Sequence, residues 1–301
     1  MFYVSGFYKF KKIININKIK LHLQDYFNKN SIKGTLIISQ EGINGTISAK
    51  RNILNLAINK IKKTFKFISF DSLNLSSSKF QPFHRGKVKS KKEVVPMGIK
   101  IPKEKLKNYI EPSKWNKLIK NKNTLLIDAR KPFEHNVGTF KNAINPQINN
   151  FREFPSYLKN LKKEKEKNIA MFCTGGIRCE KASTYLKANG FKNVYQLKGG
   201  ILNYLQKIKK KNSLWKGECY VFDNRISLKH NLKSGNYSMC SGCRKPISNK
   251  NKRSKKYEEG VSCPNCHDSL TTSQKERFRM RQKQINLAKK LGKKHIFQKE
   301  Y

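Results

Sequence analysis

The chain has 301 residues, enough for two or three domains that each bury a core, and it carries 66 lysines and arginines against 19 aspartates and glutamates, a net charge of +47. A charge of this size points to nucleic acid as a partner. The lysines are spread along the whole chain, however, and its richness in Lys, Asn and Ile also fits mutational drift in an AT-rich genome. Charge alone therefore leaves both explanations open.

Apolar runs and cysteines limit the class of protein further. No run approaches the ~18 apolar residues of a membrane span, and residues 1–8 lack the basic leader and the length of a signal core. We therefore expect no membrane segment and a cytoplasmic protein. The seven cysteines form a close pair, a single residue and a group of four. This grouping indicates a reducing compartment rather than a disulfide framework.

Residues 1–95 are predicted to form a small α/β domain. The expected elements are a strand at 2–10, a helix at 19–27, strands at 34–39 and 46–48 around a turn at 41–45, a helix at 53–65 and a last strand at 67–70. The order βαββαβ is that of a ferredoxin-like (acylphosphatase-like) sandwich. The domain has no cysteine, and His22 lies inside a helical pattern, where a structural role is expected. We expect this domain to bind a partner rather than to perform chemistry.

A basic, strand-like segment at 83–96 leads into an expected linker at 96–114. Basic and apolar residues alternate in it. His84, Arg85 and Lys87 either contact a phosphate backbone or lie on a solvated strand, and the sequence does not separate the two.

The most informative stretch is Cys-Thr-Gly-Gly-Ile-Arg-Cys at 173–179. It follows an apolar run at 168–172 and precedes a helical pattern at 180–189, so Cys173 lies where a buried strand ends and a helix is about to begin. Unpaired amides at a helix start favour an anion, and Arg178 adds a positive charge. These features predict a low pKa for Cys173 and a nucleophilic thiolate. The expected anion cradle consists of Thr174, Gly175, Gly176 and Ile177.

This loop and its neighbours resemble a rhodanese domain, expected at 115–211. Upstream, the pattern is a strand with Asp-x-Arg at 125–130, then Glu134, Gly138 and Ala-Ile-Asn-Pro at 143–146. A strand and a helix start at 194–201 close the pattern. The loop is one residue shorter than the phosphate loop of cysteine phosphatases, which suits a smaller group such as a sulfane sulfur held as a persulfide. A mostly parallel sheet with helices on both faces is expected.

Two features of this domain remain open in the sequence. Asp128 and Arg130 form either a structural ion pair or a substrate-positioning pair at the same edge of the sheet as Cys173. Cys179 either resolves an oxidised Cys173 as a disulfide, which makes it a possible redox partner, or packs as a small apolar residue.

Residues 212–301 form a Cys-rich, basic C-terminal region. The pairs Cys240–Cys243 and Cys263–Cys266 are separated by 19 residues, a spacing typical of a zinc-ribbon-like site with four cysteine ligands. Such a metal would be structural, and the alternatives are an iron site or two redox dithiols. Cys219 and His267 are assigned no role. A basic helix is expected at 273–290, either as a solvated tail or as an arm that binds an RNA backbone.

The three parts in this order resemble the tRNA uridine(34) hydroxylase family of rhodanese-domain proteins. The segments that carry the resemblance are 41–46, 173–180 and 215–223. The resemblance implies a tRNA-modifying oxidoreductase that forms 5-hydroxyuridine at the wobble position, with tRNA as partner, molecular oxygen as co-substrate and Cys173 as the essential cysteine. No flavin or haem motif is visible in the sequence. The alternatives are a sulfurtransferase that takes sulfane sulfur from a donor onto Cys173, and a non-enzymatic zinc-ribbon protein that binds RNA.

Overall fold

The computed structural model describes residues 1–98 and 108–293. The chain divides into two compact units, the first made of residues 1–219 and 229–233 and the second of residues 220–228 and 234–301. The first unit contains the N-terminal domain and the domain that carries Cys173. Residues 99–107 of the expected linker at 96–114 lie outside the described residues.

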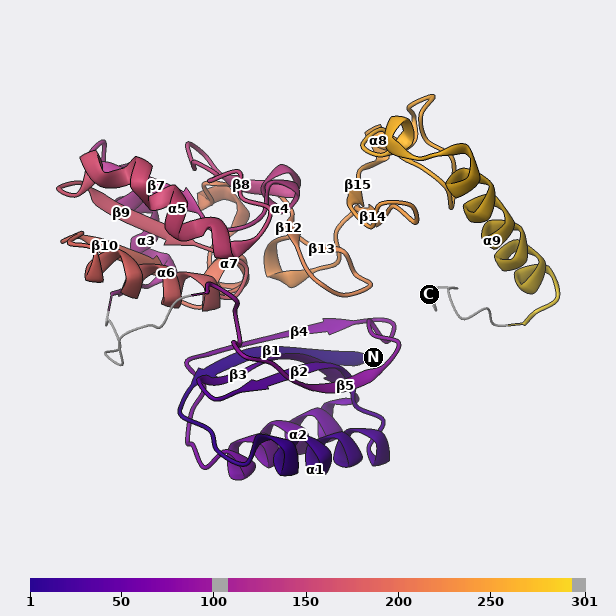
Figure 1. Ribbon diagram of the computed structural model, residues 1–301, viewed down its shortest axis with the longest axis horizontal. Helices are drawn as coiled ribbons and strands as arrows, with labels where there is room; N and C mark the ends of the chain where they lie inside the picture. The colour runs from indigo at the N-terminus through magenta and orange to yellow at the C-terminus, as the bar shows by residue number, and fades with distance from the viewer. Residues whose placement is uncertain (99–107, 294–301) are drawn as a thin grey trace. The chain divides into compact units, whose positions relative to one another are not determined.

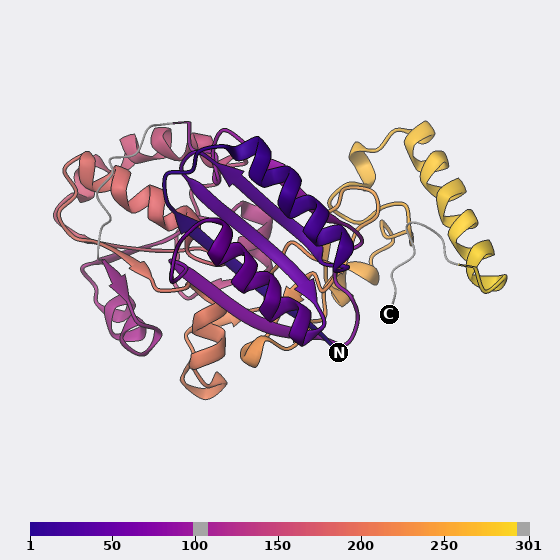
Figure 2. The ribbon, with the colours of Figure 1, turned by 90° about the horizontal axis from the view of Figure 1, so that it is seen from below.

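The N-terminal domain is a five-stranded sheet with two helices on one face (Figures 1 and 2). The strand order is β4-β1-β3-β2-β5, and β5 runs parallel to β2 while the other pairs are antiparallel. This confirms the ferredoxin-like prediction, with β5 added at the edge. The elements are β1 (Phe2–Phe10), α1 (Ile16–Lys29), β2 (Lys33–Ser39), β3 (Gly42–Ala49), α2 (Arg51–Thr64), β4 (Ser72–Ser78) and β5 (Gly86–Ser90).

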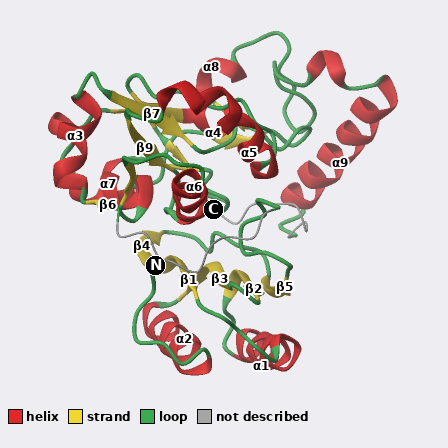
Figure 3. Cartoon of the chain, turned by 60° about the vertical axis from the view of Figure 1, so that its left-hand side comes forward, coloured by secondary structure: helices red, strands yellow, loops and turns green. Residues whose placement is uncertain are grey.

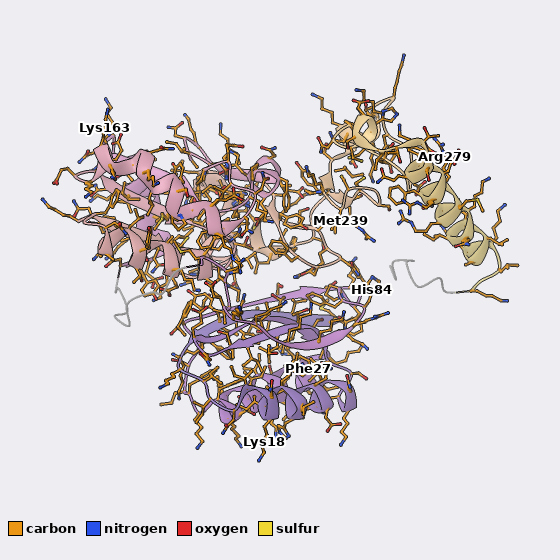
Figure 4. All side chains as sticks on the ribbon, viewed as in Figure 1. Lys18, Phe27, His84, Lys163, Met239 and Arg279 are labelled. Carbon is orange, nitrogen blue, oxygen red and sulfur yellow. The ribbon has the colours of Figure 1, made fainter. Side chains whose placement is uncertain are left out.

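The core of this domain lies between the sheet and its helices. Phe27 is fully buried and points from α1 toward the sheet, whereas Lys18 points from the same helix into solvent (Figure 4). Because successive residues of a strand face opposite sides, Phe7 of β1 lies in this core and Tyr8 does not. The opposite face of the sheet therefore presents Tyr8.

Two details of the N-terminal prediction are wrong. The last strand lies at Ser72–Ser78, not at 67–70. Phe70 packs instead on Phe7, with ring centroids 4.8 Å apart, so the aromatic residues that suggested a strand close the end of the core. The expected turn at 41–45 is also mostly strand, because residues 42–45 belong to β3 and pair with residues 10–7 of β1.

The rhodanese-like domain has a four-stranded sheet in the order β6-β10-β9-β7, and its strands are parallel, which confirms the predicted parallel sheet. Figure 3 shows α3 and α7 on one side of the sheet and α5 and α6 on the other. Strand β6 lies inside the expected linker and pairs with β10. The elements are β6 (Tyr109–Ile110), α3 (Pro112–Lys120), β7 (Thr124–Asp128), α4 (Pro132–Val137), β8 (Gly138–Phe140), α5 (Phe154–Tyr157), β9 (Asn168–Phe172), α6 (Ile177–Ala188), β10 (Val194–Leu197), α7 (Gly200–Lys207) and β11 (Trp215–Gly217), with 3-10 turns at Phe151–Glu153, Leu158–Glu164, Lys210–Asn212 and His230–Leu232.

The second unit is built from short elements around four cysteines. A hairpin of β14 and β15 carries the first cysteine pair, and a 3-10 turn and α9 follow the second. Thr271 caps α9, since its side chain accepts a hydrogen bond from the Gln274 backbone amide and the Gln274 side chain accepts one from the Thr271 amide. The elements are β14 (Ser238–Met239), β15 (Pro246–Ile247), α8 (Asn249–Lys252), a 3-10 turn at His267–Ser269 and α9 (Thr272–Lys290), preceded by β12 (Cys219–Tyr220) and β13 (Ser227–Leu228). Among the helices of the described residues, none combines the length and the apolar character that crossing a membrane requires.

Candidate active site

Cys173 lies at the carboxyl end of β9, directly before the loop that starts α6. The Gly176 amide donates a hydrogen bond to Cys173 Sγ at 3.2 Å. Gly176 has a φ of 101°, in the left-handed region that favours glycine, and this conformation turns the loop back toward the sulfur. The cradle predicted for residues 174–177 therefore curls around Cys173, although only the Gly176 contact is a direct hydrogen bond within that stretch.

The surroundings of Cys173 favour its thiolate. Burial by itself raises the pKa of the thiol, but hydrogen bonds from the Cys179 side chain and from the Cys179 and Arg178 amides, together with the Arg178 charge, lower it to about 6. At neutral pH most of Cys173 is therefore ionised.

Cys179 is fully buried beside Cys173. Burial, then the hydrogen bond to Cys173 and its charge, raise the pKa of Cys179 well above the ordinary value. Cys179 is thus held as a neutral thiol that donates to the Cys173 thiolate. Its place beside the thiolate also fits the predicted redox role, which stays a prediction.

Arg178 is oriented by Glu134. The sequence pattern of a rhodanese domain includes Glu134, but Glu134 was not predicted as a site residue. Arg178 Nη1 and Nη2 donate to the two carboxylate oxygens of Glu134 at 2.8 and 2.9 Å. Nη2 also lies 3.3 Å from the Thr174 hydroxyl. Glu134 is fully buried at the start of α4. The place of Glu134 between Asp-x-Arg and Gly138 was the only signal for it in the sequence.

Asp128 and Arg130 form a buried structural pair. Arg130 donates to both Asp128 oxygens at 2.8 and 2.6 Å and to the Gly138 carbonyl at 2.6 Å. Both side chains are fully buried. Burial would raise the pKa of Asp128, but the Arg130 charge and the hydrogen bonds from His135 and Arg130 lower it to about 2. Of the two alternatives left open, the geometry favours the structural pair.

The start of α7 closes the underside of the loop. The amides of Ile201 and Leu202 donate to the carbonyl oxygens of Cys173 and Thr174 at 3.0 and 3.1 Å. A side chain at Gly200 would meet the Cys173 carbonyl oxygen at 2.5 Å, whereas one at Gly175 would meet nothing within 4 Å. The loop is therefore open at Gly175.

The four predicted metal ligands come together in the second unit. The sulfur atoms of Cys240, Cys243, Cys263 and Cys266 all lie within 4.8 Å of one another, and three of their separations are 3.8 Å. Four sulfurs at about 2.3 Å from a zinc ion form a tetrahedron with edges of about 3.8 Å. The donor set therefore fits a structural zinc ion.

The predicted RNA contacts are exposed basic residues. His84, Arg85 and Lys87 are exposed, and Lys87 lies on β5. The basic helix is not a free tail, because Arg281 of α9 donates to the carbonyl oxygens of Ser241 and Gly260 at 3.2 and 3.0 Å. Arg279 of the same helix pairs with both carboxylate oxygens of Glu258 at 2.6 and 2.7 Å, whereas Arg277 and Lys283 are exposed.

A glycine-turned loop at the end of a parallel strand, with a cysteine thiolate inside and an arginine at its end, defines a rhodanese-like domain. The family model described as the rhodanese-like domain matches residues 111–207, and the model described as the UPF0176 acylphosphatase-like domain matches residues 2–94. A protein of Pelagibacter ubique (strain HTCC1062), named tRNA uridine(34) hydroxylase, is 68% identical over 302 residues, which span 100% of both chains. This chain therefore belongs to the tRNA uridine(34) hydroxylase family.

Among solved structures, similar chains include a rhodanese-related protein of Thermoplasma volcanium, 28% identical, with 33% of this chain and 90% of that chain covered and a TM-score of 0.29. A rhodanese-like domain protein of Staphylococcus aureus is also 28% identical, with 32% and 90% covered and a TM-score of 0.28.

Proposed function

We propose that this chain hydroxylates the uridine at position 34 of tRNA to 5-hydroxyuridine and that Cys173 is the nucleophile. The full-length relative named for this activity supports the reaction, since its 68% identity extends over all of both chains. The observation that carries the role of Cys173 is the 3.2 Å contact of its sulfur with the Gly176 amide, in a loop that is open at Gly175 and that lowers the pKa of the thiol to about 6.

A thiolate in this position can activate a uracil ring. Addition of Cys173 Sγ to C6 forms an S–C6 bond, and the electron pair of the C5–C6 double bond moves onto C5 and O4. C5 becomes electron-rich and reacts with molecular oxygen, the proposed co-substrate. One oxygen atom enters at C5, and the second is reduced to water by two electrons from a proposed external reductant of the thiol class. The C5 hydrogen then leaves as a proton while the S–C6 bond breaks, which restores the C5–C6 double bond. The cradle amides and Arg178 keep the sulfur anionic before the attack and stabilise it again when it leaves.

The basic surface supplies the attraction for tRNA. With 66 lysines and arginines against 19 acidic residues, the chain is expected to bind the RNA backbone in a salt-dependent way. The exposed residues near β5 and on α9 are the proposed contacts, and a zinc ion held by the four cysteines would keep the second unit folded. We place the reaction in the cytoplasm, where tRNA is found.

The test is a nucleoside analysis, by mass spectrometry, of tRNA from cells with and without this protein. We expect 5-hydroxyuridine and its derivatives to fall without the protein and to return with the wild type but not with Cys173→Ser. Cys219→Ser, which removes another buried thiol, is the matched control and should restore the modification. Full restoration by Cys173→Ser would exclude Cys173 as the nucleophile.

The same thiolate can carry a sulfane sulfur, so sulfur transfer is the second candidate function. If loss of the protein leaves tRNA unchanged, incubation with thiosulfate should produce a persulfide on Cys173, detected by mass spectrometry, and release thiocyanate from cyanide. If the protein hydroxylates tRNA and forms no persulfide on Cys173, the sulfurtransferase function and its sulfur donor are excluded.

A further inference from the structure

Tyr8 of the N-terminal domain contacts the loop that holds Cys173. It lies on the face of the sheet opposite the helices and is only 3% exposed. Its hydroxyl oxygen is 3.1 Å from the point that a Cβ atom on Gly176 would occupy. The Gly176 amide is the group that donates to Cys173 Sγ. The Tyr8 oxygen therefore lies beside the same glycine whose amide contacts the thiolate.

The Tyr8 hydroxyl donates its hydrogen to Glu180. Tyr8 Oη donates to Glu180 Oε1 at 3.1 Å, Tyr109 donates to the same oxygen, and Gln196 Nε2 donates to Oε2 at 3.2 Å. These three donors point at a carboxylate, which can only accept. With its hydrogen on Glu180, the Tyr8 oxygen presents only lone pairs to a neighbouring ligand.

Lys181 fixes this arrangement between the two domains. Its ammonium group is buried and pairs with Glu41 at 2.7 Å and Glu93 at 2.8 Å. Glu180 and Lys181 are adjacent near the start of α6, so both residues bind the helix that begins at the Cys173 loop to the N-terminal domain. Glu41, which begins the segment 41–46 that carries part of the family resemblance, therefore contacts the helix that starts at the Cys173 loop.

We infer that Tyr8 is a specificity-determining residue: its oxygen accepts a hydrogen bond from the N3–H group of a uracil ring at the Cys173 loop, and Glu180 is the positioning residue that keeps the Tyr8 hydrogen turned away. This inference rests on the proposed function. Cytosine has no N3–H and would place its own N3 lone pair against that of Tyr8, so it is rejected.

The experiment measures binding, so that it does not depend on turnover. Full-length Cys173→Ser protein is titrated with RNA hairpins that carry uridine or cytidine at position 34 and are otherwise identical. We expect a preference for uridine, which Tyr8→Phe lowers roughly tenfold because one hydrogen bond is lost. Tyr109→Phe is the matched control: it removes a donor to the same Glu180 oxygen but leaves the Tyr8 hydroxyl in place, so the preference should remain.

Variants of Glu180 test its positioning role. Glu180→Leu frees the Tyr8 hydrogen to turn toward the N3 lone pair of cytosine, so cytidine binding should improve although Tyr8 is unchanged. Glu180→Gln keeps a carbonyl oxygen as acceptor and should restore the preference for uridine. A structural role alone would give no gain in cytidine binding.

The inference is overturned if Tyr8→Phe keeps the full preference, if Tyr109→Phe loses as much as Tyr8→Phe, or if the parent protein does not distinguish the hairpins. The proposed function fails by a different result, namely no 5-hydroxyuridine formed by the wild type. A Tyr8-dependent preference for uridine found together with that result would still support the inference.

Discussion

Arg178 and Glu134 form a two-point ion pair inside the rhodanese-like domain, with N–O distances of 2.8 and 2.9 Å. The Arg178 side chain is held by a fully buried carboxylate, so its charge is fixed close to Cys173 before any substrate binds. Preorganised charge of this kind stabilises an anion without rearrangement at the moment of reaction.

Alkylation of Cys173 should follow its low pKa. Because the pKa is lowered from 9.0 to about 6, the thiolate fraction rises through pH 6 and the rate with iodoacetamide should level off above about pH 7. Peptide mapping by mass spectrometry after short exposure should find the label on Cys173 and not on Cys179 or Cys219, whose pKa values burial raises. A half-maximal rate near pH 9 would contradict the thiolate assignment.

The two partners of the ion pair should act on Cys173 in different directions. Arg178→Gln removes a positive charge and should raise the pKa of Cys173. Glu134→Gln leaves that charge in place and removes a negative one, so the pKa of Cys173 should not rise. Arg178→Gln leaves the fully buried Glu134 charge without this partner and should lower the free energy of unfolding by roughly 3–5 kcal/mol, whereas Glu134→Gln leaves Arg178 partly exposed beside the Cys173 thiolate and should cost less. The pH profile of alkylation and urea unfolding measure the two effects, and a rise in pKa in both variants would argue for general loosening of the loop.

Gly175 and Gly176 should respond differently to alanine. Gly175→Ala places a methyl group in open space and should change the free energy of unfolding little. Gly176→Ala puts a side chain at a φ of 101° and against the Tyr8 hydroxyl, and we expect a loss of about 1–2 kcal/mol. The Gly176 amide should also move away from Cys173 Sγ, which raises the pKa of that thiol. Thermal unfolding and the alkylation profile check both points, and equal behaviour of the two variants would contradict the loop geometry.

Local patterns made much of this fold predictable. The Cys173 loop and the two cysteine pairs are encoded in short stretches whose spacing reflects a turn or a knuckle, so the sequence was enough to propose them. Strand β4 was missed because its sequence, Ser-Leu-Asn-Leu-Ser-Ser-Ser, lacks the β-branched and aromatic residues typical of strands. Its pairing with β1 is a tertiary effect that no local pattern contains.

Partners that lie far apart in the chain could not be predicted. Glu134 is 44 residues from Arg178, and Tyr8 is 172 residues from Glu180. The sequence does not indicate that Phe7 of β1 packs in its own domain while Tyr8 contacts the other. It also does not indicate that Glu41, in a turn, forms an ion pair with the buried Lys181 of α6. The Glu134 contact depends on how α4 and α6 pack inside one domain, and the contacts of Tyr8 and Glu41 depend on how two domains pack.

The cysteine cluster should hold one zinc ion per chain and keep α9 in place. Elemental analysis of the purified protein should find zinc, lost in Cys263→Ser and kept in Cys219→Ser. Arg281 of α9 donates to the backbone carbonyl groups of Ser241, which lies inside the first cysteine pair, and of Gly260, which lies between the two pairs. Release of the metal should therefore loosen both carbonyl groups and free α9. Hydrogen exchange should then quicken across residues 234–293 after chelation, while the amides of β7 and β9 keep their protection. Iron in place of zinc would contradict the identity of the metal. Unchanged exchange in α9 after chelation would contradict its structural role, because the helix would then be held by contacts that do not depend on the metal.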